Sequence, residues 1–191
     1  MPASDLKGLI AWLKANPNKA TQANAGFGGP SHVAGLLFQK ETATNFQFVP
    51  YRGAGPAMLD LVAGHIDLMI TTEGLPQIRL GTIKAYAVMA KTRFSAAPDI
   101  PTIDEGGLPG LYASIWNAIW VPKRTPKDVI NKLNGAVVDG LASPAAIKRL
   151  ADLGQNIFPR DQQTPEALRA FQKAEIEKWW PIIKAAGIRT Q

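Results

Sequence analysis

A short strand, a glycine-rich turn and an apolar helix follow one another twice near the start of this chain, and this repeated pattern limits the fold more than any other feature. In order, the two sets are Ala20–Asn24, Ala25–His32 and Ser31–Lys40, and then Asn45–Pro50, Tyr51–Pro56 and Ala57–Ala63. A third strand, Ile66–Ile70, leads into the loop Thr71–Gly74, and its apolar run is typical of a strand buried on both faces of a sheet. The alternation predicts an α/β fold with a parallel sheet.

The three loops that follow these strands are the candidate binding site. In an open α/β sheet, ligands bind beyond the carboxyl ends of the strands, and all three loops lie at such ends. The candidate residues in them are Gly26, Phe27, Gly28, Gly29, Ser31, His32, Tyr51, Arg52, Gly53, Ala54, Gly55, Thr71 and Thr72. The expected convergence of the loops favours ligand binding more strongly than any one loop does.

A glycine turn that leads into a helix suits an anion. Glycine permits backbone angles that other residues resist and lets a ligand approach the main chain. Pro30 suits the first helical position, and Ser31 can accept from nearby amides. The start of the helix offers unpaired N–H groups and the positive end of its dipole, which attract a carboxylate or a phosphate. Because many such turns are only turns, the motif by itself divides evenly between a binding and a structural interpretation.

Individual side chains in these loops each allow a binding role and a structural role. His32 is either a donor to a ligand carboxylate or, as we favour for a lone histidine, a helix-capping or packing residue. Arg52 is either a planar fork for a carboxylate or a solvated charge, and we expect the amides of Gly53–Gly55 to matter more. Thr71 and Thr72 offer hydroxyl donors or ordinary turn hydrogen bonds.

The remaining chain is expected to form helices, short strands and one long connection. The expected helices are Leu6–Leu13, capped by Ser4 and Asp5, and then Leu75–Leu80, Pro126–Leu141, Pro144–Leu153 and Thr164–Ala186, with Ser143, Gly154 and Gly187 at helix ends. The expected strands are Ile83–Ala90, Tyr112–Val121 and Asn156–Phe158. Lys91–Gly110 is expected to be an ordered surface connection. Four tryptophans are expected to be packing residues: Trp12, Trp120, Trp179 and Trp180.

Composition excludes several classes of function. The absence of cysteine from the 191 residues excludes disulfides and thiol catalysis. Two histidines do not make a zinc constellation, and no nucleophile elbow, phosphate-binding loop or His-Glu-x-x-His motif is present. We therefore expect no enzyme, no metal and no cofactor.

The charge and the termini bear on partners and location. A net charge of +6 suits an anionic partner, but the basic residues are scattered, so we expect a small acidic solute rather than nucleic acid. No apolar run approaches the ~20 residues of a membrane span. The N-terminal sequence Met-Pro-Ala-Ser-Asp-Leu-Lys has no basic and apolar leader, so no signal peptide is expected in this chain.

Six motifs follow one another along the chain in a familiar order. They are Ala25–Gly35 (AGFGGPSHVAG), Val49–Ala57 (VPYRGAGPA), Leu61–Asp67 (LVAGHID), Gly81–Val88 (GTIKAYAV), Pro98–Gly110 (PDIPTIDEGGLPG) and Lys184–Ile188 (KAAGI). In these motifs the sequence resembles the Bug-type extracytoplasmic solute receptors, the TctC-like substrate-binding proteins of tripartite tricarboxylate transporters. The likeness extends over essentially the whole chain.

The resemblance implies a periplasmic-binding-protein type 2 architecture and a role in transport. Residues 1–115 are then a complete α/β lobe, the family's second, and residues 116–191 are the hinge crossover and the helical remainder of a truncated first lobe. A cleft between the lobes closes on a small carboxylate, lined by the candidate loops and by Trp116, with a hinge near Ala113–Val121. The partner is a membrane permease, and the location is the periplasm.

The chain departs from the family in length. Family members are substantially longer, so the resemblance implies that most of the first lobe lies upstream of the position where this chain begins. Apolar helix faces left open cost several kcal/mol at ~25 cal/mol per Å2, so we expect a homodimer or a segment-exchanged assembly to cover them. Two alternatives stay open: a short form that acts as an interaction or structural protein, and an enzyme on an organic acid with His32 as its base.

Overall fold

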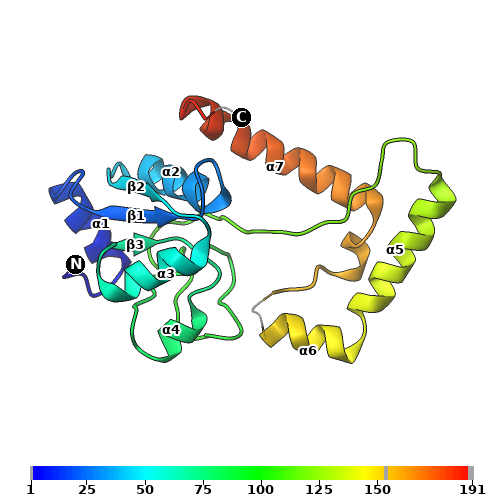
Figure 1. Ribbon diagram of the computed structural model, residues 1–191, viewed down its shortest axis with the longest axis horizontal. Coiled ribbons are helices and arrows are strands. Elements are labelled where there is room, and N and C mark those ends of the chain that lie inside the picture. Colours follow the sequence, from blue (N-terminus) through cyan, green and yellow to red (C-terminus); the bar gives the residue numbers. More distant parts are fainter. Residues whose placement is uncertain (1, 153–154, 189–191) are drawn as a thin grey trace. The chain divides into compact units, whose positions relative to one another are not determined.

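The computed structural model describes residues 2–152 and 155–188 of the chain (Figure 1). The chain divides into two compact units, one formed by Met1–Ile115 and Trp180–Gln191 and the other by Trp116–Trp179. The sheet and the loops predicted to bind a ligand belong to the first unit. Trp116 begins the second unit.

The first unit is built on a three-stranded parallel sheet. Its strands are β1 (Thr21–Asn24), β2 (Gln47–Pro50) and β3 (Leu68–Met69), in the order β2-β1-β3. β1 pairs with β2 over four residues and with β3 over two, so β1 is the central strand. The predicted α/β fold and parallel sheet are confirmed.

Two helices cover opposite faces of this sheet. α2 (Pro30–Thr42) lies so close to one face that a Cβ added at Gly35 would be 2.2 Å from Gln22 Oε1. α3 (Ala54–Ala63) packs on the other face, where Ala57 joins Ala23 and Ile66 in one buried apolar cluster. Gln22 and Ala23 are neighbours in β1 and so point to opposite faces. Figure 1 shows α2 and α3 on the two sides of the strands.

α1 (Leu6–Ala15) begins as predicted at a capped end. The Asp5 carboxylate accepts a hydrogen bond of 2.7 Å from the Gly8 amide, and Leu6, Leu9 and Leu13 are buried at helical spacing. α4 (Leu75–Arg79) is the short helix expected after β3. These helices confirm the periodicity seen in the sequence.

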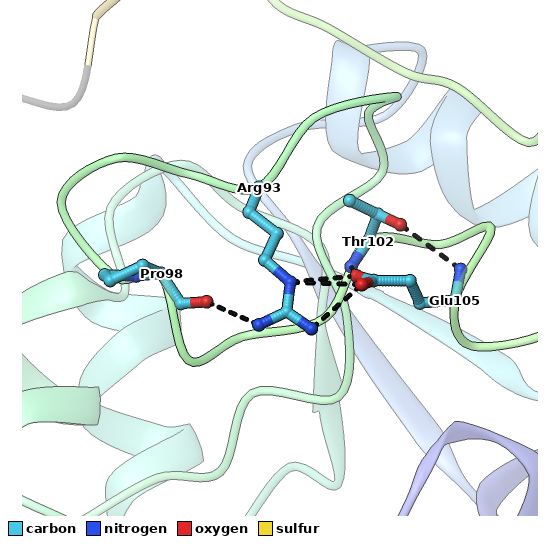
Figure 2. Close-up of polar contacts among 4 residues, drawn as sticks. All are labelled: Arg93, Pro98, Thr102 and Glu105. Atoms are coloured by element: carbon cyan, nitrogen blue, oxygen red, sulfur yellow. Dashed lines mark hydrogen bonds and ion pairs between the residues drawn. The ribbon is translucent and has the colours of Figure 1, made fainter.

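The connection Lys91–Gly110 is ordered by an ion pair between Arg93 and Glu105 (Figure 2). The Arg93 guanidinium donates to both carboxylate oxygens, at 3.0 Å from Nε to Oε2 and 2.8 Å from NH2 to Oε1, and also to the Pro98 carbonyl. Glu105 in turn accepts from the Thr102 amide, while Thr102 Oγ1 accepts from the Glu105 amide. Ile103, which lies between Thr102 and Glu105 in the chain, is buried. The segment is therefore held both by its internal hydrogen bonds and by a buried side chain.

The second unit contains helices and an aromatic contact. α5 (Lys127–Leu141), α6 (Pro144–Asp152), the 3-10 turn η1 (Arg160–Gln162) and most of α7 (Pro165–Ala185) belong to it. The rings of Trp116 and Phe158 pack edge-on against the Phe171 ring, at centroid distances of 5.3 and 5.4 Å. α6 is capped by Ser143, and the left-handed Gly187 ends α7, both as predicted.

Three predicted strands are wrong. Ile83–Ala90 is irregular and makes one isolated bridge, between Val88 and Thr102, while Tyr112–Val121 and Asn156–Phe158 have no strand pairing. A strand needs a continuous run of hydrogen bonds with a neighbour, and within the described residues these segments make only scattered ones, such as that from the Val88 amide to the Pro101 carbonyl. β3 is likewise shorter than the predicted Ile66–Ile70.

Two further expectations need correction or lie outside the description. Trp120 and Trp180 are 58% and 61% exposed, so they are not packing residues within this chain. Leu153 and Gly154, the predicted end of α6, lie outside the described residues. In the part of the chain that the structure covers, no helix combines the length and apolarity needed to cross a membrane.

Candidate functional site

The carboxyl ends of the three strands bring the three predicted loops to one edge of the sheet. Because β1, β2 and β3 are parallel, the turn 25–29, the turn 51–53 and the loop 70–74 all leave from the same edge. The turn after β1 is in the middle, since β1 is the central strand. The Tyr51 amide donates to the Asn24 carbonyl at 2.9 Å and joins the first two turns directly.

The two glycine turns lead to helices on opposite faces of the sheet. From β1 the chain passes to α2 on one face, and from the adjacent β2 it passes to α3 on the other face. Neighbouring parallel strands whose connections diverge in this way leave a crevice between their carboxyl ends, and open α/β sheets bind ligands there. The turns after β1 and β2 therefore begin at the strand ends where the connections change from one face of the sheet to the other.

The turn after β1 uses some of its amides internally and leaves others unpaired. The amides of Ala25, Gly28 and Gly29 donate to Ser31 Oγ, His32 Nδ1 and the Gly26 carbonyl, at 3.0, 3.0 and 3.2 Å. Within the described residues, the amides of Gly26, Phe27 and Ser31 have no hydrogen-bond partner. Gly26 and Gly28 adopt φ of +120° and +77°, which glycine tolerates and other residues resist.

The turn after β2 leaves even more of its amides unpaired. Gly53, at φ +110°, is the N-cap of α3 and provides no capping side chain. Among the residues described, the amides of Arg52, Gly53, Ala54 and Gly55 have no acceptor. The first-turn amides of a helix need a partner from a side chain, water or a ligand.

The two helices that begin at this edge, α2 and α3, have no side-chain cap. α1, α6 and α7 begin with side-chain caps from Asp5, Ser143 and Thr164. α2 and α3 begin without one, as do the short α4 and, in the second unit, α5. At the carboxyl edge of the sheet, the helices that follow two neighbouring strands thus begin with bare amides and positive dipole ends, which favour an anion.

His32 is held inside the turn rather than presented on its surface. Its side chain is 3% exposed, and its ring lies 4.5 Å from Phe27 and 4.6 Å from Phe48 between centroids. Because Nδ1 accepts the Gly28 amide, the neutral ring carries its proton on Nε2. Burial lowers the pKa of His32 from its ordinary value, which keeps the ring neutral.

Tyr51 is directed toward α3. Its hydroxyl donates to Asp60 Oδ2 at 2.7 Å, and its ring packs against the cluster that contains Ala57. This hydrogen bond is the main cause of a raised pKa for Tyr51 and a lowered pKa for Asp60, whose other oxygen lies 3.3 Å from His65 Nδ1. Tyr51 and Asp60 therefore fasten the second turn to the helix that follows it.

The other predicted side chains are less constrained. Arg52 and Thr72 are exposed, and Thr71 Oγ1 accepts the Glu73 amide at 3.1 Å, an ordinary turn hydrogen bond. Trp116 belongs to the second unit, where it contacts Phe171. In the described parts of the chain, no group of three or more His, Asp or Glu side chains is arranged to hold a metal ion.

Asn24 is a residue that the sequence analysis did not single out. It is the last residue of the central strand, its side chain is fully buried, and within the described residues both its amide atoms lack a hydrogen-bond partner. Gln22, on the same face, donates to the Ser31 carbonyl but leaves Oε1 unpaired. The sequence did contain a signal for this residue, because Gln22 and Asn24 place two amide side chains in a strand expected to be buried. Buried polar groups usually have hydrogen-bond partners, so such residues call for an explanation.

Comparison with known proteins identifies the family. Residues 1–188 match the model of the tripartite tricarboxylate transporter family receptor, TctC. The chain belongs to this family. A UPF0065 protein of Agrobacterium vitis is 42% identical over 181 residues, which are 94% of this chain and 52% of that protein. This member of the family thus spans about half the length of that curated relative.

Solved structures of family members show the same fold. The periplasmic binding protein BugD matches with a TM-score of 0.85 and 38% identity over 100% of this chain and 64% of its own. MatC from Rhodopseudomonas palustris, solved with bound malate, matches with a TM-score of 0.86 and 33% identity, over 95% of this chain and 63% of its own. The expected periplasmic-binding-protein architecture is therefore confirmed, and the family consists of solute receptors.

Proposed function

We propose that this chain binds a small carboxylate solute at the edge formed by the turns after β1 and β2. The observation that carries the proposal is the pair of uncapped helix starts, α2 and α3, on adjacent parallel strands. Within the described residues, seven amides of these two turns have no hydrogen-bond partner: those of Gly26, Phe27, Ser31, Arg52, Gly53, Ala54 and Gly55. The malate bound to MatC supports a carboxylate as the ligand class.

The chemistry of the edge favours a carboxylate over a nucleotide. Backbone amides and the Ser31 hydroxyl donate to a carboxylate without bringing a full charge, and charge-assisted hydrogen bonds of this kind are the stronger ones. The glycine turn has no Lys-Ser/Thr pair of the sort that holds nucleotide phosphates. The candidate side chains Arg52, Thr71 and Thr72 then select among acids rather than provide the main attraction.

Calorimetric titration of the full chain tests this proposal. We expect saturable binding of L-malate or of another acid in a panel of succinate, adipate and citrate. Ala54→Pro deletes one unpaired amide at the first helical position, where proline is tolerated, while Ala54→Gly keeps that amide. One charge-assisted hydrogen bond is worth about 1.5–3 kcal/mol, so Ala54→Pro should weaken binding about 10- to 150-fold. Ala54→Gly should stay within about threefold, since it removes no donor.

A chain that binds none of the acids at millimolar concentration contradicts the proposal. Equal affinities for Ala54→Pro and Ala54→Gly would instead show that the α3 amides are not part of the site. Thermal stabilisation by one acid, growing with its concentration, is an independent sign of binding to the folded state.

We further propose that the bound solute is delivered to the permease of a tripartite transporter in the periplasm. Membership of the receptor family supports this role. The delivery step predicts that a vesicle-reconstituted transporter takes up the acid only when a competent receptor is added. Uptake that does not depend on the receptor would contradict this part of the proposal.

We also propose that a second copy, or an exchanged segment of one, covers exposed apolar side chains of the helices. α5 exposes Val129 and Leu133, four residues apart, and α7 exposes Ile176 and Trp180 at the same spacing. Each pair lies on one helix face, and exposed apolar stripes of this kind mark interaction surfaces. Light scattering should give the mass of a dimer, and Leu133→Glu should shift it toward the monomer; a monodisperse wild-type monomer would refute this proposal.

A further inference from the structure

The turn after β1 contains a buried imidazole that makes no contact expected of a ligand donor. His32 is 3% exposed, and its Nδ1 is occupied by the Gly28 amide at 3.0 Å. Phe27 and Phe48 enclose the ring from the turn and from β2. An imidazole so placed acts on the turn through the Gly28 amide that it holds.

The hydrogen bond to His32 decides which amides of the turn stay available. Gly28 donates into the interior, while the flanking amides of Gly26 and Phe27 have no partner in the described structure. Gly28 has φ +77°, a left-handed conformation that glycine adopts readily. Without the imidazole acceptor the one remaining side-chain hydrogen bond of the turn in the described structure, from the Ala25 amide to Ser31 Oγ, holds only its start, and the glycines that follow allow many conformations.

We propose that His32 is a positioning residue for solute capture, which accepts the Gly28 amide at Nδ1 and thereby directs the unpaired amides of the turn toward the carboxylate. The inference rests on the proposed function and adds an explanation of how the amides at the binding edge are oriented before the solute arrives. Preorganised donors bind an anion more tightly because the order is already present before the solute arrives. His32 thus contributes to affinity without touching the solute.

This positioning works only while the imidazole is neutral. A protonated Nδ1 is a donor, so it cannot accept the Gly28 amide. Phe27, Gly28 and Phe48, which contact the ring, carry no titratable function, and no ion pair or side-chain hydrogen bond of His32 to a charged group is found in the described structure. Solute affinity should therefore fall as the pH decreases below the ordinary histidine value of 6.5, in step with protonation of this one residue.

Two substitutions separate the hydrogen bond from the packing of the ring. His32→Asn places Oδ1 where Nδ1 stands and can still accept the Gly28 amide, whereas His32→Gln carries its amide further out, near the position of Nε2. Both lose the ring contacts with Phe27 and Phe48, so their loss of stability should be similar. The difference in their affinity for L-malate, measured by calorimetry on the full chain, reports the hydrogen bond alone.

We expect His32→Gln to bind L-malate roughly three- to tenfold more weakly than His32→Asn at pH 7.5, the effect of one net hydrogen bond. Between pH 7.5 and 5.5 the affinity of the wild type should fall further than that of His32→Asn, since titration of the acid itself is common to both. Equal affinities for the two variants and parallel pH profiles would overturn the inference while leaving the proposed function intact. A wild type that binds no acid would overturn both.

Nitrogen NMR spectroscopy of the free protein tests the inference without any solute. We expect His32 to be the Nε2–H tautomer at pH 7.5 and the Gly28 amide to exchange slowly with solvent in the wild type and in His32→Asn. An Nδ1–H tautomer, or a Gly28 amide that exchanges at the rate of an open turn, would overturn the inference whatever the titrations show.

Discussion

α2 approaches the sheet closely at Gly35, and this approach yields a quantitative prediction. An added Cβ at this position of α2 would lie 2.2 Å from Gln22 Oε1, 2.6 Å from Phe48 Cε1 and 3.0 Å from Gln22 Cδ. Gln22 is almost fully buried and donates to the Ser31 carbonyl at 3.1 Å, so its amide has little room to withdraw. Gly35→Ala should therefore displace α2 from the strand that carries the binding edge.

Three contributions set the size of the effect. Overpacking a core costs about 1–3 kcal/mol. Loss of the hydrogen bond from Gln22 leaves a buried amide unpaired and costs about 1–3 kcal/mol more. The higher helix propensity of alanine returns about 1 kcal/mol. The net destabilisation is then about 1–5 kcal/mol, and at 2–4 °C per kcal/mol for a chain of this size a central value of ~3 lowers the Tm by roughly 6–12 °C.

Thermal unfolding followed by circular dichroism measures this shift, with Gly135→Ala as the matched control. Gly135 lies inside α5, and an added Cβ there meets nothing within 4 Å. The control should therefore gain about 1 kcal/mol from helix propensity, a rise of roughly 2–4 °C. If Gly35→Ala is as stable as Gly135→Ala, then α2 does not rest on Gln22 and Phe48, and the reasoning about the position of the first helix start is refuted.

Two further predictions concern the buried amide and the ion pair of the first unit. Asn24→Leu replaces two unpaired buried polar atoms with an apolar side chain of similar shape, so the free energy of unfolding should increase by up to about 1–3 kcal/mol and the Tm should rise with it. A lower Tm would show that Asn24 has hydrogen-bond partners in solution. The Arg93 guanidinium and the Thr102 amide lower the pKa of Glu105 to about 2, so the stabilisation by Glu105 is complete above its ordinary value of 4.5 and is lost as the pH falls from there toward 2. The difference in Tm between the wild type and Glu105→Gln should shrink over that interval in a pH series, and a constant difference would contradict this assignment.

Much of the architecture could be predicted because it follows from local patterns. Helical spacing of Leu6, Leu9 and Leu13 after a capping Asp5 defines α1, and Gly64 ends α3 in a left-handed conformation that favours glycine. The alternation of strands and helices implies a parallel sheet, and a parallel sheet necessarily gathers its following loops at one edge. The family resemblance is carried by the same local motifs.

The failed strands show where local pattern is insufficient. Ile83–Ala90 has the composition of a strand, but its single bridge joins Val88 to Thr102, a residue of the connection held by Arg93 and Glu105. Strand formation depends on a neighbour with unpaired backbone groups, and no local sequence specifies that neighbour. Exposure of Trp120 and Trp180 has the same origin, since burial depends on what packs against a side chain.

The order of amino acids is enough to predict glycine turns that lead into helices at the ends of parallel strands, because glycine, proline and apolar periodicity act over a few residues. Which amides those turns leave free depends on the folded chain as a whole. That choice depends on an acceptor brought from elsewhere, as when His32 takes the Gly28 amide and the Asn24 carbonyl takes that of Tyr51. A hydrogen-bond donor is available to a ligand only when the fold has provided no closer partner.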